Sequence, residues 1–127
     1  MVKKFDDWVL EFERIHSITD TNDSIYIYLN DGSSAELDRI EKVPDNLKSL
    51  LRGDNVFWFA RLKAKKEGVG SGTVLMNELV KILDKRKISV INAVNPYGVM
   101  TMEDLLDFYK KFGFEEVEEG IMIRNPR

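Results

Sequence analysis

Apolar residues recur along the chain with two different periods, and the period separates the expected strands from the expected helices. Alternating or continuous apolar residues predict strands at 25–29, 35–40, 56–62, 88–94, 114–117 and 121–123. Apolar residues at helical spacing predict helices at 5–16, at 44–51, from Val74 to the basic residues after Leu83, and at 102–112. The polar stretch 17–23 separates the first helix from the first strand. Asn30-Asp31-Gly32-Ser33 predicts a hairpin turn between the first two strands.

The segment 65–73 joins the strand at 56–62 to the following helix and contains alternating glycines at 68, 70 and 72. In that position several backbone N–H groups can point into one concavity at the positive end of the helix dipole, an arrangement that binds phosphate. The Gly-Lys-Ser/Thr ending of a Walker loop is missing, and Thr73 stands where the dinucleotide fingerprint has its third glycine. A plain tight turn is the alternative. Lys65 and Lys66, directly upstream, favour the anion site.

Composition narrows the chemistry of the chain. A length of 127 residues with 43% hydrophobic and 32% charged residues fits one domain, taken as 1–127. The absence of cysteine and the single histidine exclude disulfides, thiolate nucleophiles and multi-histidine metal sites, so no metal is expected. No apolar run approaches the roughly 20 residues that span a bilayer, and the first residues turn acidic where a secretory signal would become apolar. We therefore expect a cytoplasmic protein with no membrane partner.

Charge is unevenly distributed around a net value of −3. Basic residues gather at 63–66 and 81–87, and acidic residues gather at 115–119. A nucleic-acid binder is usually more basic overall, so we expect no nucleic-acid partner, although a binding domain that uses the two basic clusters stays open as a weaker reading. A local cationic strip in an acidic protein suits a small anionic ligand.

Two segments together resemble the GCN5-related N-acetyltransferases. That family's pyrophosphate loop has the pattern Gln/Arg-x-x-Gly-x-Gly/Ala, and here Lys65 takes the first position, with Gly68 and Gly70 at the glycine positions. The segment 107–114 resembles the family's Leu-Tyr-x-x-x-Gly-Phe pattern, and one helix and one strand separate the two motifs, as in the family. The resemblance covers about 56–124. The compact layout and the segment 101–109 also resemble very small phage acetyltransferases, a group that includes an anti-CRISPR protein.

The resemblance implies a single-domain α/β (α+β) fold with a mixed central sheet and flanking helices, and acetyl-CoA as cofactor. The strand end at 62–64 would bind the pantetheine arm and the acetyl carbonyl, the backbone of 68–73 would hold the pyrophosphate, and Tyr109 would protonate the departing thiolate. Thr101 stands near the position where many members have a cofactor-binding asparagine. The positions thus assigned to the cofactor are Leu62, Lys63, Ala64, Lys65, Lys66, Gly68, Val69, Gly70, Ser71, Gly72, Thr73 and Thr101.

Several alternatives stay open. Residues 56–62 contain no acid, so the general base is a water chain or one of four carboxylates, among which the sequence does not choose: Glu36, Asp38, Asp54 and Glu103. Tyr109 shares an apolar helix face and could instead be a core residue; Thr101 could only cap its helix, and Asn95 could contact the ligand or be a loop residue. The acceptor is an amine of a small molecule or of a protein lysine or N-terminus, and the chain is a monomer or a homodimer. A non-catalytic module that binds CoA or a protein partner is the second reading.

Overall fold

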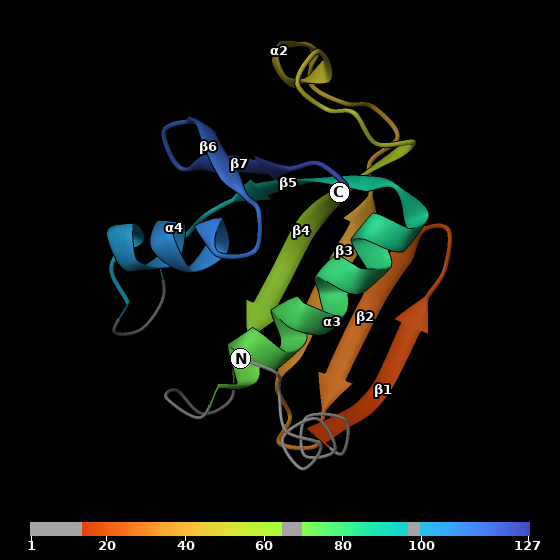
Figure 1. Ribbon diagram of the computed structural model, residues 1–127, viewed down its shortest axis with the longest axis vertical. Coiled ribbons are helices and arrows are strands. Elements are labelled where there is room, and N and C mark those ends of the chain that lie inside the picture. The colour runs from red at the N-terminus through yellow and green to blue at the C-terminus, as the bar shows by residue number, and fades with distance from the viewer. Residues whose placement is uncertain (1–13, 65–69, 97–99) are drawn as a thin grey trace.

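One mixed β-sheet organises the described part of the chain. The computed structural model describes residues 14–64, 70–96 and 100–127 (Figure 1). Within these residues seven strands form a sheet in the order β1-β2-β3-β4-β5-β7-β6. The elements are β1 Ile15–Asp20, β2 Ser24–Leu29, β3 Ser34–Arg39, α2 Asp45–Lys48, β4 Asn55–Lys63, α3 Ser71–Arg86, β5 Ile88–Ala93, α4 Met102–Lys110, β6 Glu115–Glu118 and β7 Ile121–Arg124. The expected α+β domain with a mixed sheet and flanking helices is confirmed.

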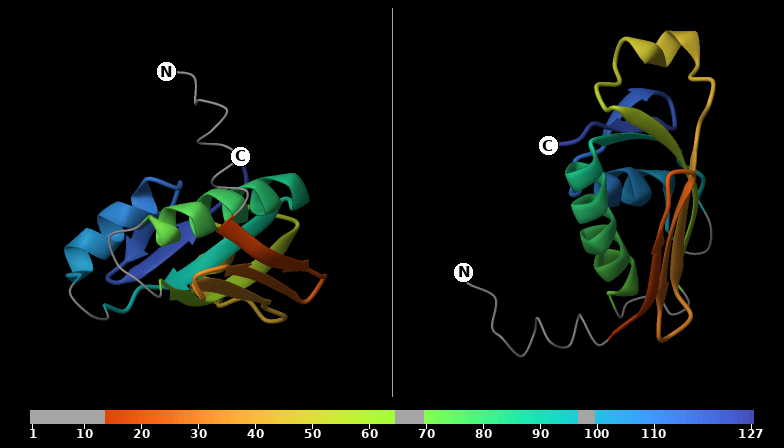
Figure 2. Two further views of the ribbon diagram at one scale, coloured as in Figure 1. Left: turned by 90° about the horizontal axis from the view of Figure 1, so that it is seen from below. Right: turned by 90° about the vertical axis from the view of Figure 1, so that its right-hand side faces the viewer.

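The sheet is antiparallel except at its centre, where β4 and β5 run parallel. Parallel neighbours need a crossover, and α3 supplies it between β4 and β5. Figure 2 shows α3 lying along one face of the strands. Alternate residues of β2, β3 and β4 point toward that helix and are buried with it: Ile25, Ile27, Leu29, Ala35, Leu37, Phe57, Phe59, Val74, Leu75, Leu79 and Leu83. Trp58 points to the other face and is 39% exposed.

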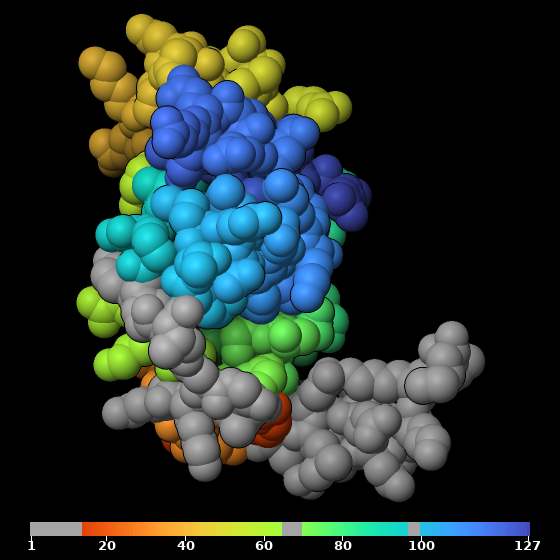
Figure 3. Space-filling model, turned by 90° about the vertical axis from the view of Figure 1, so that its left-hand side faces the viewer, coloured from red at the N-terminus to blue at the C-terminus, as the bar shows by residue number. Residues whose placement is uncertain are grey.

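Helix α4 covers a second part of the same core. In Figure 3 it lies at the centre of the face shown, between the β6–β7 hairpin and the first turns of α3. Its expected N-cap is confirmed, because the Thr101 hydroxyl accepts a hydrogen bond from the Asp104 backbone N–H at 3.1 Å. The helix ends two residues before the predicted end at 112, and Gly113 follows with a φ of 93°. A left-handed residue at that point suits glycine.

The N-terminal edge strand was mispredicted. Ile15 and His16, expected at the end of a helix, begin β1, and the polar stretch that follows continues this strand to Asp20. Residues 5–13 of the predicted helix lie outside the described residues. β1 is an edge strand, mostly exposed, whose backbone pairs with β2 from Ile15 opposite Leu29 to Asp20 opposite Ile25. Such a strand needs no apolar alternation, so the hydrophobic pattern could not reveal it.

Candidate functional site

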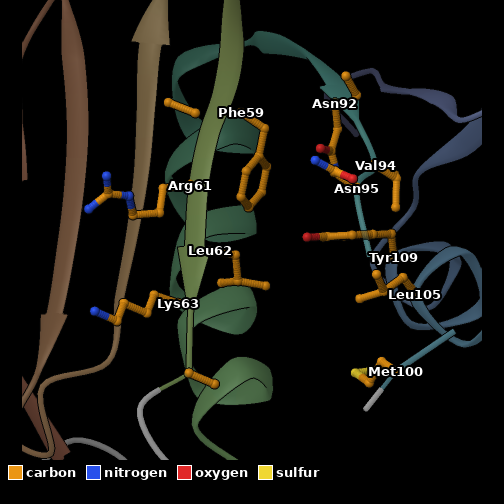
Figure 4. Close-up of a pocket in the computed structure, with 13 residues that line it drawn as sticks. Phe59, Arg61, Leu62, Lys63, Asn92, Val94, Asn95, Met100, Leu105 and Tyr109 are labelled. Atoms are coloured by element: carbon orange, nitrogen blue, oxygen red, sulfur yellow. The ribbon is translucent and has the colours of Figure 1, made fainter. Parts of the chain in front are cut away.

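The parallel strands β4 and β5 separate in the middle of the sheet. They are paired only from Asn55–Ile88 to Trp58–Ile91. Beyond Trp58, β4 remains paired with β3 as far as Lys63 opposite Ser34, but among the described strands it has no partner on its β5 side. Figure 4 shows the space that opens between the two strands. Backbone N–H and C=O groups along this edge of β4 are therefore free of the sheet ladder and can meet a ligand.

A β-bulge lies where the strands separate. Phe59 pairs with Leu37 and Arg61 pairs with Glu36, so Ala60 is an extra residue in β4. In a regular strand Phe59 and Leu62 would point to opposite faces, but across the bulge both pack against the main core. Bulges are frequent beside binding and active sites because they redirect the backbone of one strand. Here the bulge shapes the wall of the opening.

The opening is a cavity of about 540 Å³, closed on one side by α4. Its described lining residues are Phe59, Ala60, Arg61, Leu62, Lys63, Ala64, Asn92, Ala93, Val94, Asn95, Met100, Leu105 and Tyr109. The charged members are Arg61 and Lys63, both cations on β4, and the described lining holds no carboxylate. Figure 4 shows that these two side chains point away from the space between β4 and β5, so the space itself suits the apolar or amide-bearing portion of a ligand.

Tyr109 projects from α4 into this cavity (Figure 4) and is 7% exposed. Its ring meets Phe59 edge to face, with centroids 5.7 Å apart and planes at 72°, and its centroid lies 5.6 Å from that of Phe114. Burial raises the pKa of Tyr109, and the Asn92 side-chain amide partly opposes that rise. The hydroxyl is thus a fixed, protonated donor at neutral pH.

Asn92 is a site residue that the sequence did not identify. It lies in the apolar strand β5 and is 4% exposed, yet its Nδ2 has no hydrogen-bond partner within the described residues. The amide is near enough to Tyr109 to affect its pKa, but the geometry falls short of a formed hydrogen bond. The signal in the sequence was a polar amide within 88–94, a strand that is apolar apart from Ser89 and Asn92 and that the pattern reserves for the core.

The start of α3 is a second polar feature. Gly70 is the N-cap, with a φ of 78°, and no side chain of the residues that the structure describes caps the helix with a hydrogen bond. The buried Ser71 hydroxyl accepts a hydrogen bond from Arg14 Nη2 at 2.7 Å and donates one to Asp31 Oδ2 at 2.6 Å. Hydrogen bonds from Ser71 and from the Ser33 backbone N–H lower the pKa of Asp31 to about 2. Arg14 thus brings to this helix start a cation that the sequence did not indicate.

The structure unites only part of the predicted site. Leu62, Lys63, Ala64 and Tyr109 line one cavity, and so does Asn95, whose role the sequence left open. Gly70, Ser71, Gly72 and Thr73 lie at the α3 start and are not among its lining residues; nor is Thr101, whose hydroxyl is engaged as the α4 cap. Lys65, Lys66, Gly68 and Val69 lie outside the described residues. None of the four candidate carboxylate bases lines the cavity, and Glu36 accepts a hydrogen bond from the Tyr26 hydroxyl.

Comparisons with known proteins bear on the fold. No protein-family model matches the chain, and no curated protein matches it. Among solved structures, the anti-CRISPR protein AcrVA5 is similar with a TM-score of 0.59 and 17% sequence identity, over 80% of this chain and 97% of that one. At this identity the likeness concerns the fold alone. Among the described helices none is long and apolar enough to cross a membrane.

Proposed function

We propose that the protein is an N-acetyltransferase that moves an acetyl group from acetyl-CoA to an amine. The observation that carries the proposal is the opening between β4 and β5, with a free β4 edge on one side and the buried Tyr109 hydroxyl on the other. Acetyl transfer from a thioester needs a bound cofactor, a donor for the carbonyl oxygen and a proton for the departing sulfur. The cavity offers a group for each of these tasks.

The described residues fit acetyl-CoA. The free backbone edge of 59–63 suits the amide groups of pantetheine. The backbone N–H groups at the start of α3 suit the phosphates of the cofactor, beside a Ser71 hydroxyl that is bonded to both the Arg14 cation and the ionised Asp31. When bound, the cofactor would supply the reactive thioester, which accounts for acetyl chemistry in a chain without cysteine.

In this proposal the amine attacks the thioester carbonyl, and a backbone N–H of β4 near the bulge donates a hydrogen bond to the carbonyl oxygen. Tyr109 then gives its proton to the departing sulfur. Because the described lining holds no carboxylate, the proton lost by the amine passes to water. We place the protein in the cytoplasm, where acetyl-CoA is available.

The acceptor is an amine of a small molecule or of a protein. The sequence resemblance to small phage acetyltransferases and the fold likeness to an anti-CRISPR protein favour a protein acceptor, and CRISPR effector proteins are one class to include. A second candidate function, a non-catalytic module that binds CoA, is favoured by the lack of a carboxylate in the described lining.

Thiol release from acetyl-CoA, measured with a panel of amines, peptides and effector proteins, tests the proposal. Tyr109→Phe should lower kcat by about 100-fold or more while the Kd for acetyl-CoA changes less than about twofold. Tyr26→Phe is the matched control, because Tyr26 does not line the cavity, and its kcat should equal that of the parent.

The other outcomes separate the readings. Acetyl-CoA that raises the melting temperature without any thiol release would favour the non-catalytic module. No thermal shift at saturating acetyl-CoA would overturn both readings. Equal kcat in Tyr109→Phe and the parent would remove Tyr109 from the acid role.

A further inference from the structure

We propose that Asn92 is a positioning residue that acts through Tyr109: its side-chain N–H holds the Tyr109 oxygen and stabilises the phenolate formed when that hydroxyl gives up its proton. The inference rests on the proposed function, because it assigns a second residue to the same proton transfer.

The first observation is the cost of leaving this amide buried without a partner. Asn92 is 4% exposed and faces the buried Met122 across the β5–β7 pair, yet its Nδ2 has no hydrogen-bond partner in the described part of the chain. Buried polar groups nearly always find a partner, because an unsatisfied one destabilises the fold by about 1–3 kcal/mol. An apolar residue would complete this strand at no such cost. The amide is therefore retained for a contact that is made only during function.

The second observation is where the amide lies. Asn92 from β5 and Tyr109 from α4 both project into the space between β4 and β5 (Figure 4). The charged residues of the described lining are Arg61 and Lys63 of β4, whose side chains point away from this space (Figure 4); β5 and α4 contribute no charged group to the described lining. Nevertheless, the interaction that lowers the pKa of Tyr109 comes from Asn92, against the larger effect of burial. Asn92 thus favours the ionised form of this phenol.

The proton transfer then balances as follows. The amine nitrogen forms a bond to the thioester carbonyl carbon, the carbon–sulfur bond breaks, and its electron pair stays on sulfur. The Tyr109 proton goes to that sulfur, which leaves the negative charge on the Tyr109 oxygen. The Asn92 Nδ2–H group donates a hydrogen bond to this oxygen, and the bond strengthens as the negative charge on the oxygen grows. The proton released by the amine passes to water, and Tyr109 regains a proton from solvent.

A double-mutant cycle with Asn92→Leu and Tyr109→Phe tests the coupling. Leucine has nearly the shape of asparagine and no polar atom. Loss of one hydrogen bond to a charged group predicts a kcat about 10- to 100-fold lower in the parent background. In the Tyr109→Phe background the same change should alter kcat less than about twofold, because the phenolate no longer exists. The Kd for acetyl-CoA should stay within about twofold in both backgrounds.

Two results of the cycle would overturn the proposal. Equal losses of kcat in both backgrounds would show that Asn92 acts independently of Tyr109. A weaker Kd for acetyl-CoA in both backgrounds would show that the amide binds the cofactor directly. A merely structural role predicts a lower melting temperature for Asn92→Leu, whereas we expect a higher one. If Asn92→Leu fails to fold, Asn92→Ser, which is polar but too short to reach Tyr109, takes its place.

A third measurement does not depend on activity and so separates failure of this inference from failure of the proposed function. Tyrosine is replaced by 3-fluorotyrosine, whose phenol ionises at lower pH, and a ¹⁹F NMR titration follows position 109, assigned by its absence in Tyr109→Phe. Asn92→Leu should raise the pKa of this phenol relative to the parent. An unchanged pKa would overturn the coupling even if the protein transfers acetyl groups, and a raised pKa would support it even if no acceptor is found.

Discussion

Asn92 and Arg124 are polar side chains buried to nearly the same degree, but only Arg124 has its hydrogen bonds satisfied. Arg124 on β7 is 2% exposed, and its Nη1 and Nη2 donate to the two Asp84 carboxylate oxygens at 2.8 and 3.1 Å. Its Nε donates to the Phe112 carbonyl at 2.6 Å. Asn92 on the neighbouring strand β5 is 4% exposed and has an Nδ2 without a partner in the described residues. A buried polar group whose hydrogen bonds are all formed holds secondary-structure elements together. A buried polar group that lines a cavity and lacks a partner indicates a functional site.

The hydrogen bonds of Arg124 hold three parts of the structure together. Through Asp84 and the Phe112 carbonyl, one guanidinium joins β7 to the end of α3 and to the turn after α4. Gly113 lies against this cluster, because a Cβ there would come within 2.8 Å of Arg127 Nη2 and 3.2 Å of Arg124 Nε. Packing against these arginines therefore requires glycine at position 113, whether or not the Gly113-Phe114 segment serves a ligand.

Arg124→Met should produce the largest effect on stability. It removes every hydrogen bond of the guanidinium and leaves the Asp84 carboxylate without its ion-pair partner. The free energy of unfolding should fall by about 3 kcal/mol, measured by chemical denaturation at neutral pH. A loss below about 1 kcal/mol would show that Arg124 does not fasten these elements.

A pair of asparagine substitutions tests the comparison with opposite signs. Asn125 is well partnered: its Oδ1 accepts from the Arg52 N–H and the Ser89 hydroxyl, both at 2.8 Å, and its Nδ2 donates to the Leu50 carbonyl at 2.9 Å. Asn125→Leu should lower the free energy of unfolding by about 2 kcal/mol, whereas Asn92→Leu should raise it by about 1 kcal/mol. Denaturation curves of both variants check this. A destabilised Asn92→Leu would mean that its amide is satisfied in solution.

The same distinction explains how much of the fold the sequence could predict. Strands such as β2, β4 and β5 and helices α3 and α4 were predictable because one face or both are apolar, and burial imposes a period. β1 was missed because backbone pairing with β2 holds this exposed edge strand. The hairpin turn before β3 and the Thr101 cap were predictable from local hydrogen-bonding chemistry.

Only those residues of the candidate site that belong to short sequence motifs could be predicted. The strand end at 62–64 and Tyr109 came from a resemblance, and the cavity includes both. The bulge at Ala60, the separation of β4 from β5 and the burial of Asn92 depend on strand register, which a local pattern does not carry. The Arg14–Ser71–Asp31 contacts join three distant parts of the chain and left no mark in the sequence.

Thr101 belongs to the satisfied class, and its substitution should show this. Its hydroxyl caps α4, so Thr101→Ala should lower the free energy of unfolding by about 1 kcal/mol. Because Thr101 is not among the cavity's lining residues, the Kd for acetyl-CoA should stay within about twofold of the parent by isothermal titration calorimetry. A Kd for acetyl-CoA raised 10-fold or more in Thr101→Ala would show that Thr101 binds the cofactor, as the resemblance implies.

Acid pH should weaken the Arg124–Asp84 ion pair and lower the free energy of unfolding by a smaller amount. Burial alone would raise the pKa of Asp84, but hydrogen bonds from Arg124 and the Arg127 backbone outweigh it, and the net pKa is lowered. The resulting stabilisation is complete above the unfolded-state pKa of about 4 and is lost as the pH falls through the folded-state value. The parent should therefore lose more stability than Asp84→Asn between pH 6 and pH 3, by less than the Arg124→Met effect, in denaturation curves at each pH. Asp31, whose low pKa is common to both proteins, cancels in the difference. Parallel losses in the two proteins would mean that Asp84 is not held ionised by Arg124.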